Sequence, residues 1–204
     1  MTNLAEKRNR FELLMERAKI PADIIDSFFS EGYIDRVECS RKNREWTFYL
    51  VKERLVPRDV YSAFCRRIQE QFAHIAKISF VIRYSDQVDH TTLAREYWSL
   101  FIDWVQREVA SVNGWLSKAK VEVRGQTLCV HLLDEPWVEF AQKKQIDRKA
   151  EQFFQVFFCR QYKVQFFVSD NRIAEYERFA HMIEEEEERL AAESLAAQDE
   201  PAKA

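Results

Sequence analysis

The chain contains 204 residues, with 31 basic and 34 acidic side chains and a formal net charge of −3. This balance excludes a strongly basic coat protein for nucleic acid, because net charge alone supplies no general attraction to phosphate. Hydrophobic residues make up 47% of the chain and aromatic residues 14%, so it can bury a core and is not disordered as a whole. The three glycines, Gly32, Gly114 and Gly125, lie far apart. Their spacing excludes the glycine-rich loops that hold phosphates in dinucleotide-binding and P-loop proteins.

The first part of the chain predicts helix, hairpin, helix and strand in that order. Apolar residues at helical spacing predict the first helix, Pro21 opens a short second one and Gly32 ends it. Two β-rich stretches joined by a polar turn then predict a hairpin, and Pro57 suits the start of a longer helix. We expect these elements at residues 11–18, 21–31, 33–39, 46–51, 57–72 and 78–84.

The second part predicts the same order with one additional helix. A long helix with an aromatic face comes first, and an Arg124-Gly125 turn joins the strands of a hairpin. Pro136 then opens one helix, and Asp147 can cap another before a final strand. We expect these elements at residues 93–105, 121–123, 128–132, 136–141, 147–158 and 162–168.

The predicted fold class is α+β, with two small three-stranded units and a C-terminal helix. The units are expected at residues 1–85 and 86–170, and residues 171–204 are expected to form a helix from Asn171 that fades into an acidic linker. Residues 175–204 carry a net charge of −7 and include the run Glu184 to Glu188, which cannot fill a core.

Neither cysteines nor histidines form a recognisable site. The four cysteines lie far apart, so we expect them to be reduced and mostly buried. The four histidines show no metal-binding spacing, and no serine or cysteine lies in a tight glycine turn. We therefore expect no catalytic residue, metal or cofactor. No signal peptide or apolar membrane span is recognisable, which makes a cytoplasmic protein without a membrane partner the expectation.

The order α-β-β-α-α-β in the second unit is that of a type II KH-like module, in which a GxxG loop between consecutive helices clamps nucleic acid. The corresponding loop here has no glycine, so close approach to a phosphate is disfavoured. Its basic residues could still contact single-stranded DNA, although a loop of a KH-like fold used for protein contacts is preferred. These residues are Lys143, Lys144, Arg148 and Lys149.

Two further surfaces are candidates for binding. Arg41, Lys42 and Arg44 lie at the predicted tip of the first hairpin and could contact a phosphate backbone, although acidic neighbours weaken their field. Most aromatic residues follow core periodicity, but three fall outside it, and exposed aromatic residues more often mark a protein interface than a base-stacking platform. These three are Tyr49, Trp98 and Phe167.

Three stretches resemble the N-terminal region of the PolC-type DNA polymerase III alpha subunit, the replicative polymerase of low-GC Gram-positive bacteria. They are residues 10–14 (Arg-Phe-Glu-Leu-Leu), residues 72–77 (Phe-Ala-His-Ile-Ala-Lys) and Tyr97-Trp98, and with the order of elements the similarity extends over nearly the whole chain. The resemblance implies a parent chain with polymerase and 3′–5′ exonuclease activity, none of whose catalytic residues are present here. It also implies a KH-like unit similar to the polymerase-binding domain of the clamp-loader tau subunit.

The resulting hypothesis is a non-catalytic docking module that makes protein contacts within the replisome, with tau as the expected partner. The alternative is a weak single-stranded nucleic-acid-binding module, and a third reading is a structural spacer or dimerisation unit.

Overall fold

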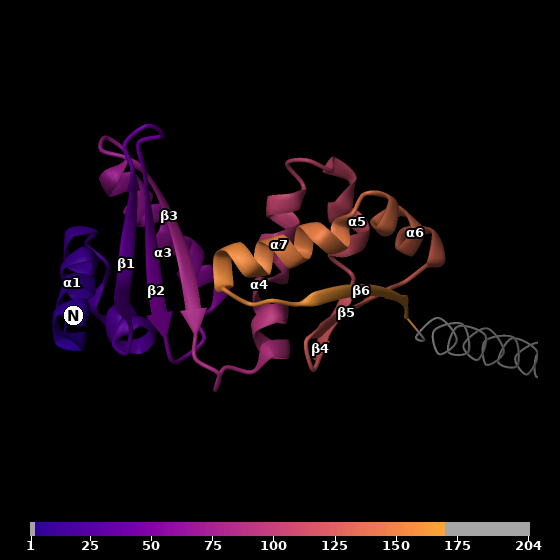
Figure 1. The fold of residues 1–204 in the computed structure, drawn as a ribbon, viewed down its shortest axis with the longest axis horizontal. Helices are drawn as coiled ribbons and strands as arrows, with labels where there is room; N and C mark the ends of the chain where they lie inside the picture. The colour runs from indigo at the N-terminus through magenta and orange to yellow at the C-terminus, as the bar shows by residue number, and fades with distance from the viewer. Residues whose placement is uncertain (1–2, 170–204) are drawn as a thin grey trace, which may run out of the picture.

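The computed structural model describes residues 3–169, which form two three-stranded sheets side by side, each with its own helices (Figure 1). The predicted α+β class is therefore confirmed. The helix expected from Asn171 and the acidic linker lie outside the described residues.

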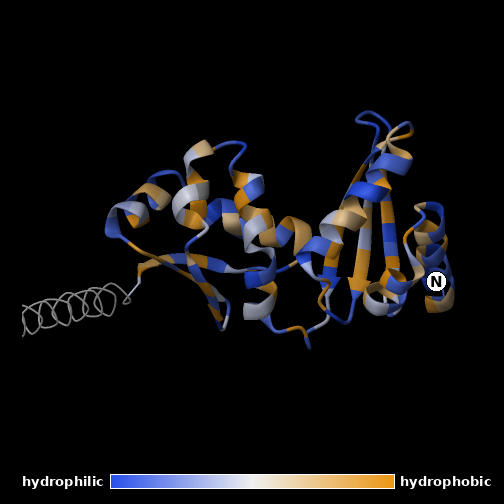
Figure 2. Cartoon of the chain, turned by 180° about the vertical axis from the view of Figure 1, so that it is seen from behind, coloured by the Kyte–Doolittle hydropathy of each residue, from blue (hydrophilic) through white to orange (hydrophobic). Residues whose placement is uncertain are grey.

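The first sheet has the spatial order β1-β2-β3, with β1 and β2 antiparallel and β2 and β3 parallel. A long helix supplies the crossover that a parallel pair requires. Apolar and polar residues largely alternate along these strands (Figure 2), because successive side chains point to opposite faces and one face packs against the helices of the first unit. The elements are α1 (Leu4–Arg17), α2 (Ala22–Ile24), η1 (Ile25–Phe29), β1 (Tyr33–Ser40), β2 (Glu45–Lys52), α3 (Arg58–Phe72) and β3 (Lys77–Tyr84).

Helix α1 begins at a local capping interaction and packs against β1. The Asn3 side chain accepts a hydrogen bond from the Ala5 backbone N–H at 3.3 Å, which satisfies one of the free donors at the helix start. Phe11, Leu14 and Met15 form its buried stripe. In β1 the pairing register shifts between Ile34 and Arg36, an irregularity of the kind that bends an edge strand.

The second sheet repeats this connectivity. Its order is β4-β5-β6, with an antiparallel hairpin and a parallel third strand. Gly125 has a positive φ of 62° in the hairpin turn, at the predicted position. The elements are α4 (His90–Val105), η2 (Ala110–Val112), α5 (Asn113–Leu116), β4 (Lys120–Arg124), β5 (Thr127–Leu132), α6 (Glu135–Lys143), α7 (Ile146–Phe158) and β6 (Lys163–Val168).

Side chains of α4 occupy the outer edge of β4. The Thr91 hydroxyl accepts from the Val123 N–H at 2.9 Å, and Arg95 Nε donates to the Val121 carbonyl at 2.7 Å. Backbone groups of an edge strand are otherwise free to pair with another chain. Helix α4 therefore blocks extension of the second sheet on this side.

The two sheets meet through a buried aromatic cluster. Tyr97 of α4 stacks on Phe158 of α7 at a centroid distance of 4.2 Å, and both contact Tyr84 at the end of β3. The Tyr97 hydroxyl donates to the Val56 carbonyl at 2.7 Å and lies 2.6 Å from the Tyr84 hydroxyl. Burial raises the pKa of Tyr84 to about 12, so its hydroxyl stays protonated at neutral pH.

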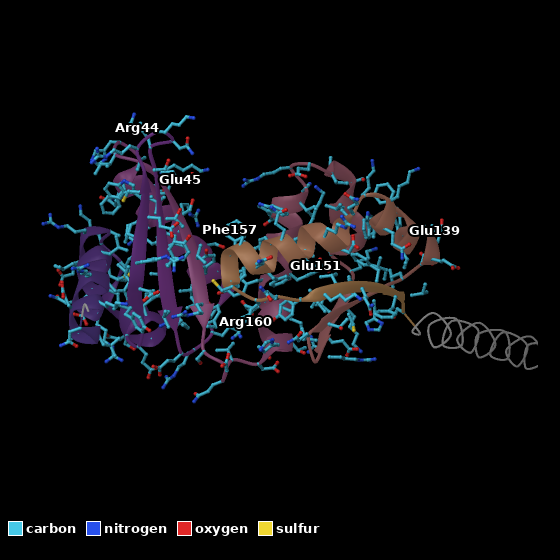
Figure 3. All side chains as sticks on the ribbon, viewed as in Figure 1. Arg44, Glu45, Glu139, Glu151, Phe157 and Arg160 are labelled. Carbon is cyan, nitrogen blue, oxygen red and sulfur yellow. The ribbon has the colours of Figure 1, made fainter. Side chains whose placement is uncertain are left out.

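Arg160 reinforces this junction from the chain that follows α7 (Figure 3). Its guanidinium donates to the Tyr84 carbonyl at 3.0 Å and to the Ser85 carbonyl at 2.9 Å, and it pairs with Asp86 at 3.3 Å. A residue of the second sheet's helical layer thus holds the segment that leaves β3.

The cysteines differ from the prediction in their burial. All four are free, but Cys39 and Cys159 are exposed, Cys65 is half-buried and Cys129 is buried. Cys39 lies on an edge strand, and Cys159 follows α7 in a left-handed conformation, so an apolar sequence context does not cover either thiol. The expectation of mostly buried cysteines was wrong for these two positions.

Candidate functional site

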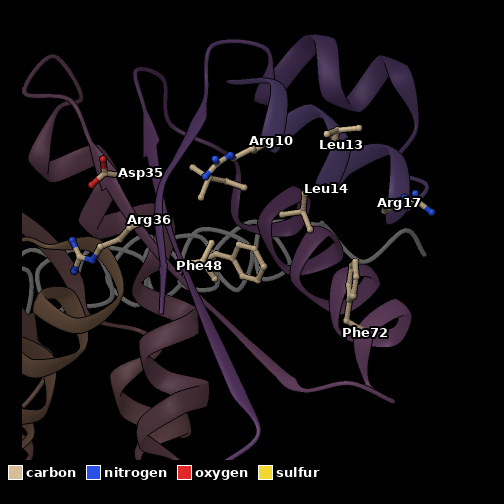
Figure 4. Close-up of a pocket in the computed structure, with 10 residues that line it drawn as sticks. Arg10, Leu13, Leu14, Arg17, Asp35, Arg36, Phe48 and Phe72 are labelled. Carbon is tan, nitrogen blue, oxygen red and sulfur yellow. The ribbon is translucent and has the colours of Figure 1, made fainter. Parts of the chain in front are cut away.

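A groove of about 430 Å³ lies between α1, the first two strands and the end of α3 (Figure 4). Its apolar lining includes Leu13, Val37 and Phe72. Leu13 is 49% exposed and Val37 is 41% exposed. Single exposed apolar residues are common on protein surfaces, but these two line the same concave surface. This groove is an apolar recess open to solvent.

The spacing of residues on α1 explains one wall of the groove. Arg10, Leu13 and Arg17 recur at i, i+3 and i+7, so they share a helical face beside the buried stripe. This face projects an apolar residue between two arginines. The floor comes from residues remote in sequence, including Phe48 of β2.

The rim of the groove is mainly cationic. Arg10 forms an ion pair with Glu6, while Arg17 has no ion pair with any of residues 3–169. The ammonium of Lys7 donates to Asp35 at 2.6 Å, and this hydrogen bond holds the pKa of the carboxyl below its ordinary value. Asp35 is therefore neutralised locally by Lys7, and Arg10 is partly neutralised by Glu6, so Arg17 is the rim cation that keeps its full charge.

Tyr49, expected at a protein interface, is partly covered. Its hydroxyl donates to Glu38 at 2.8 Å, and the Arg36 guanidinium lies 3.6 Å from the centre of its ring. The hydrogen bond to the Glu38 carboxylate, together with burial, raises the pKa of Tyr49 above its ordinary value. One ring face is therefore already occupied by a cation.

Trp98 is in the core, and the expectation of an exposed aromatic residue was wrong here. It is 5% exposed, packs on Phe101 at 4.9 Å and donates its indole N–H to the Leu116 carbonyl at 3.1 Å. Helix α4 is covered on two sides, by β4 and by the segment containing α5, so its second face is also buried. Phe167 is 41% exposed.

The hairpin tip carries the expected basic residues at its surface. Arg41, Lys42 and Arg44 are all exposed. The Arg44 guanidinium donates to the backbone carbonyls of His74 at 3.1 Å and Ile75 at 3.3 Å, and Figure 3 shows it at the end of the hairpin. Arg44 thus ties the tip to the α3–β3 loop, while Arg41 and Lys42 have no ion pair within the part of the chain that the structure describes.

The loop between α6 and α7 differs from the prediction at the start of α7. The helix begins at Ile146, and the residue before it, Gln145, has a left-handed backbone (φ 54°) without a side-chain cap, so Asp147 is not the cap. Of the four basic candidates here, Lys149 forms an ion pair with Glu108 and the other three are exposed: Lys143, Lys144 and Arg148.

The structure does not bring these two basic clusters together. The last residue of α7, Phe158, lies at the junction with the first sheet, and the 13-residue helix is about 20 Å long. Its N-terminal loop therefore points away from the first sheet, as Figure 1 shows, whereas the hairpin tip belongs to that sheet.

Lys52 was missed by the sequence analysis. It is 2% exposed and is the one charged residue that is buried among those described. Burial lowers the pKa of its ammonium from 10.5 to about 8, and the ammonium lies 5.6 Å from the centre of the Phe29 ring. The signal was present, because Lys52 continues the alternation of Phe48 and Leu50 on the core face of β2.

Within residues 3–169, no three histidine, cysteine, aspartate or glutamate side chains are grouped so that they could hold a metal ion. None of the helices in this range has the length and apolarity needed to cross a membrane. The groove beside α1 combines apolar side chains with charged ones in its lining.

Two family models match consecutive parts of the chain. The model described as DNA polymerase III polC-type N-terminus I matches residues 10–82, and the model described as DNA polymerase III polC-type N-terminus II matches residues 96–204. The first range contains β1, β2 and all but the last two residues of β3, and the second range contains the whole second sheet.

Curated relatives have the same family name. The DNA polymerase III PolC-type of Bacillus cereus is 23% identical over 182 residues, which are 89% of this chain and 12% of the relative. That of Halalkalibacterium halodurans is 24% identical over 189 residues, 93% of this chain and 13% of the relative. That of Oceanobacillus iheyensis is 29% identical over 96 residues, 47% of this chain and 7% of the relative. The chain thus spans a small fraction of the length of these relatives.

Two three-stranded sheets with their helices, matched in turn by two N-terminal models, define the class: an N-terminal region of a DNA polymerase III. More particularly, the chain belongs to the PolC-type DNA polymerase III family. The resemblance inferred from residues 10–14, 72–77 and 97–98 is confirmed.

Proposed function

We propose that this chain is a non-catalytic docking module at the N-terminus of a replicative DNA polymerase, acting in the cytoplasm. The parent chain would carry the polymerase and 3′–5′ exonuclease activities elsewhere. The observation that carries the proposal is the groove beside α1, an apolar recess with an arginine rim. Its proposed partner is a protein of the replisome, the clamp-loader tau subunit.

The composition of the groove supports a protein partner. Half-exposed Leu13 and Val37 can lose the rest of their exposed surface only to another apolar surface, which favours association. Arg10 and Arg17 flank Leu13 and would favour carboxylates at the edge of the contact. An amphipathic segment with acidic residues beside its apolar stripe has this combination.

Tethering is the proposed mechanism. A second contact between polymerase and clamp loader raises the effective concentration of each near the other, even when the contact itself is weak. The docking module need not change the chemistry of nucleotide addition to affect how long the polymerase stays at the fork.

The proposal is tested with the Leu13→Glu variant and purified tau by calorimetry. A carboxylate at position 13 should weaken binding at least about tenfold, because it removes an apolar side chain from the contact and can pair with the arginines that would otherwise receive the partner's carboxylates. Leu4→Glu is the matched control, since Leu4 is 46% exposed on the same helix but does not line the groove. Equal effects of the two changes, or the absence of tau binding by the unmodified chain, would contradict the proposal.

The alternative function, weak binding of single-stranded DNA, is favoured by one observation: Arg41 and Lys42 are exposed without an ion pair among the described residues. Contacts of this kind release counterions, so affinity should fall steeply with salt. Charge reversal at Arg41, Lys42 and Arg44 tests it. An unchanged affinity for DNA would remove the hairpin tip as the site.

A further inference from the structure

The second sheet has one face that no helix of residues 3–169 covers. Helices α6 and α7 pack on the other face, where Val130, Val164 and Phe166 are buried. The uncovered face presents three rows of residues across β4, β5 and β6. In the pairing register these rows are Lys120, His131 and Phe167; Glu122, Cys129 and Gln165; and Arg124, Thr127 and Lys163.

The first row presents an aromatic stack. The Phe167 ring lies 5.5 Å from the His131 ring at an angle of 27°, so one face of the phenyl ring is covered by the imidazole. Phe167 is nevertheless 41% exposed. A planar group that packs against the free face would continue the stack.

The charges around this stack are predominantly positive. Lys120, Arg124 and Lys163 surround a single carboxylate, Glu122. That carboxylate is already engaged, because Arg124 contacts it at 2.5 Å and His131 at 3.2 Å. Lys120 and Lys163 are exposed and have no ion pair within residues 3–169.

The spacing of these groups suits a chain of alternating bases and phosphates. Lys163 and Phe167 lie on the same strand four residues apart, which is about 13 Å at about 3.3 Å per residue. Lys120 lies two strands from Phe167 in the same row, at about 10 Å. Lys163 and Lys120 thus lie on two sides of the Phe167 ring.

We propose that the uncovered face of β4-β5-β6 binds single-stranded DNA, with Phe167 stacking on a base and Lys120, Arg124 and Lys163 contacting the phosphates. Platforms of this kind combine aromatic rings on a sheet with a basic surround and bind with little sequence preference. A protein partner is less well matched, because two of the three cations lack a carboxylate of their own and the apolar area is a single ring. The proposal is independent of the groove beside α1.

The test uses fluorescence anisotropy of a labelled oligothymidylate about twelve nucleotides long with the whole 204-residue chain. Phe167→Ala should weaken binding roughly tenfold, and Phe167→Trp should retain it, since stacking needs only an aromatic face. Val168→Ala is the matched control, because Val168 is 40% exposed and adjacent in sequence but projects from the other face. Thermal melting verifies that each variant is folded.

Salt dependence provides a second measurement. Three phosphate contacts predict a slope of about −2 in log affinity against log salt, and Lys163→Ala should reduce its magnitude by about 0.7. Charge reversal at Arg41, Lys42 and Arg44 should leave the affinity unchanged, which separates this site from the hairpin tip. Absence of DNA binding by the unmodified chain would overturn the proposal, as would equal affinities of the unmodified chain and Phe167→Ala. A loss of tau binding in Phe167→Ala with DNA binding intact would instead identify the face as a protein interface.

Discussion

Replacing Lys52 by methionine should stabilise the protein at neutral pH. Lys52 is 2% exposed on the core side of β2, and its stem passes Gly32, where an added Cβ would lie 2.8 Å from the Lys52 Cδ. Methionine is unbranched and of similar length, so it can follow the same path without the charge. The substitution therefore isolates the cost of burying an ammonium group.

The pKa of Lys52 provides the magnitude. Burial lowers it from 10.5 to about 8, and one pKa unit corresponds to about 1.36 kcal/mol. Charging Lys52 in the folded protein therefore costs about 3 kcal/mol more than in the unfolded chain. We expect Lys52→Met to raise the free energy of unfolding by up to about this amount at about pH 7.

The sign of the pH dependence follows from the direction of this pKa change. Below about pH 8, Lys52 is protonated in both states and the full cost is present. Between about pH 8 and pH 10.5 the unfolded chain binds more protons than the folded one, so the stability contributed by this residue rises with pH. The advantage of Lys52→Met should therefore shrink across this window.

Urea unfolding followed by tryptophan fluorescence at several pH values measures this difference. Lys42→Met is the control, because Lys42 is exposed at the hairpin tip and should show no such pH-dependent difference. A variant that is less stable than the unmodified protein at about pH 7, or a stability difference that stays constant through the window, would refute the reasoning.

Two further changes test other parts of the fold. Tyr97→Phe should lower the free energy of unfolding by about 1–3 kcal/mol, because it leaves the buried Val56 carbonyl without the hydroxyl that donates to it at 2.7 Å. Urea titration measures this difference, and an unchanged midpoint would argue against the hydrogen bond. Gln145→Gly should raise the melting temperature, since a left-handed residue other than glycine costs about 1–2 kcal/mol, whereas Gln142→Gly within α6 should lower it. The reverse order of the two melting temperatures would contradict the assignment of strain to Gln145.

The helices and strands were predictable because their periodicity is local. The alternation of Phe80, Ile82 and Tyr84 predicts a strand with one buried face, and all three are buried. The same alternation, extended by one step beyond Leu50, would have placed Lys52 on the core side of β2. Lys52 was not predicted to be buried because a charged residue is rarely found in a core, although the alternation indicates this position.

Other features depend on contacts between remote segments. Trp98 lies on a second face of α4, and only the packing of the α5 segment shows that this face is covered. The groove is similar: the spacing of Arg10, Leu13 and Arg17 defines one wall, but its floor needs strands and a helix end that the sequence alone does not place. Local patterns therefore predicted the helices and strands, whereas the groove and the buried faces depend on how these elements pack together.

The junction between the sheets has a consequence for any partner that touches both of them. Tyr97 and Arg160 hold the end of β3 and the turn after it through buried or partly buried hydrogen bonds, so bending at that point would break several of them together. The junction then fixes the distance and the angle between the α1 groove and the uncovered face of β4-β5-β6. A ligand or assembly that contacts both surfaces must match this distance, and one of a different length would gain nothing from a second contact.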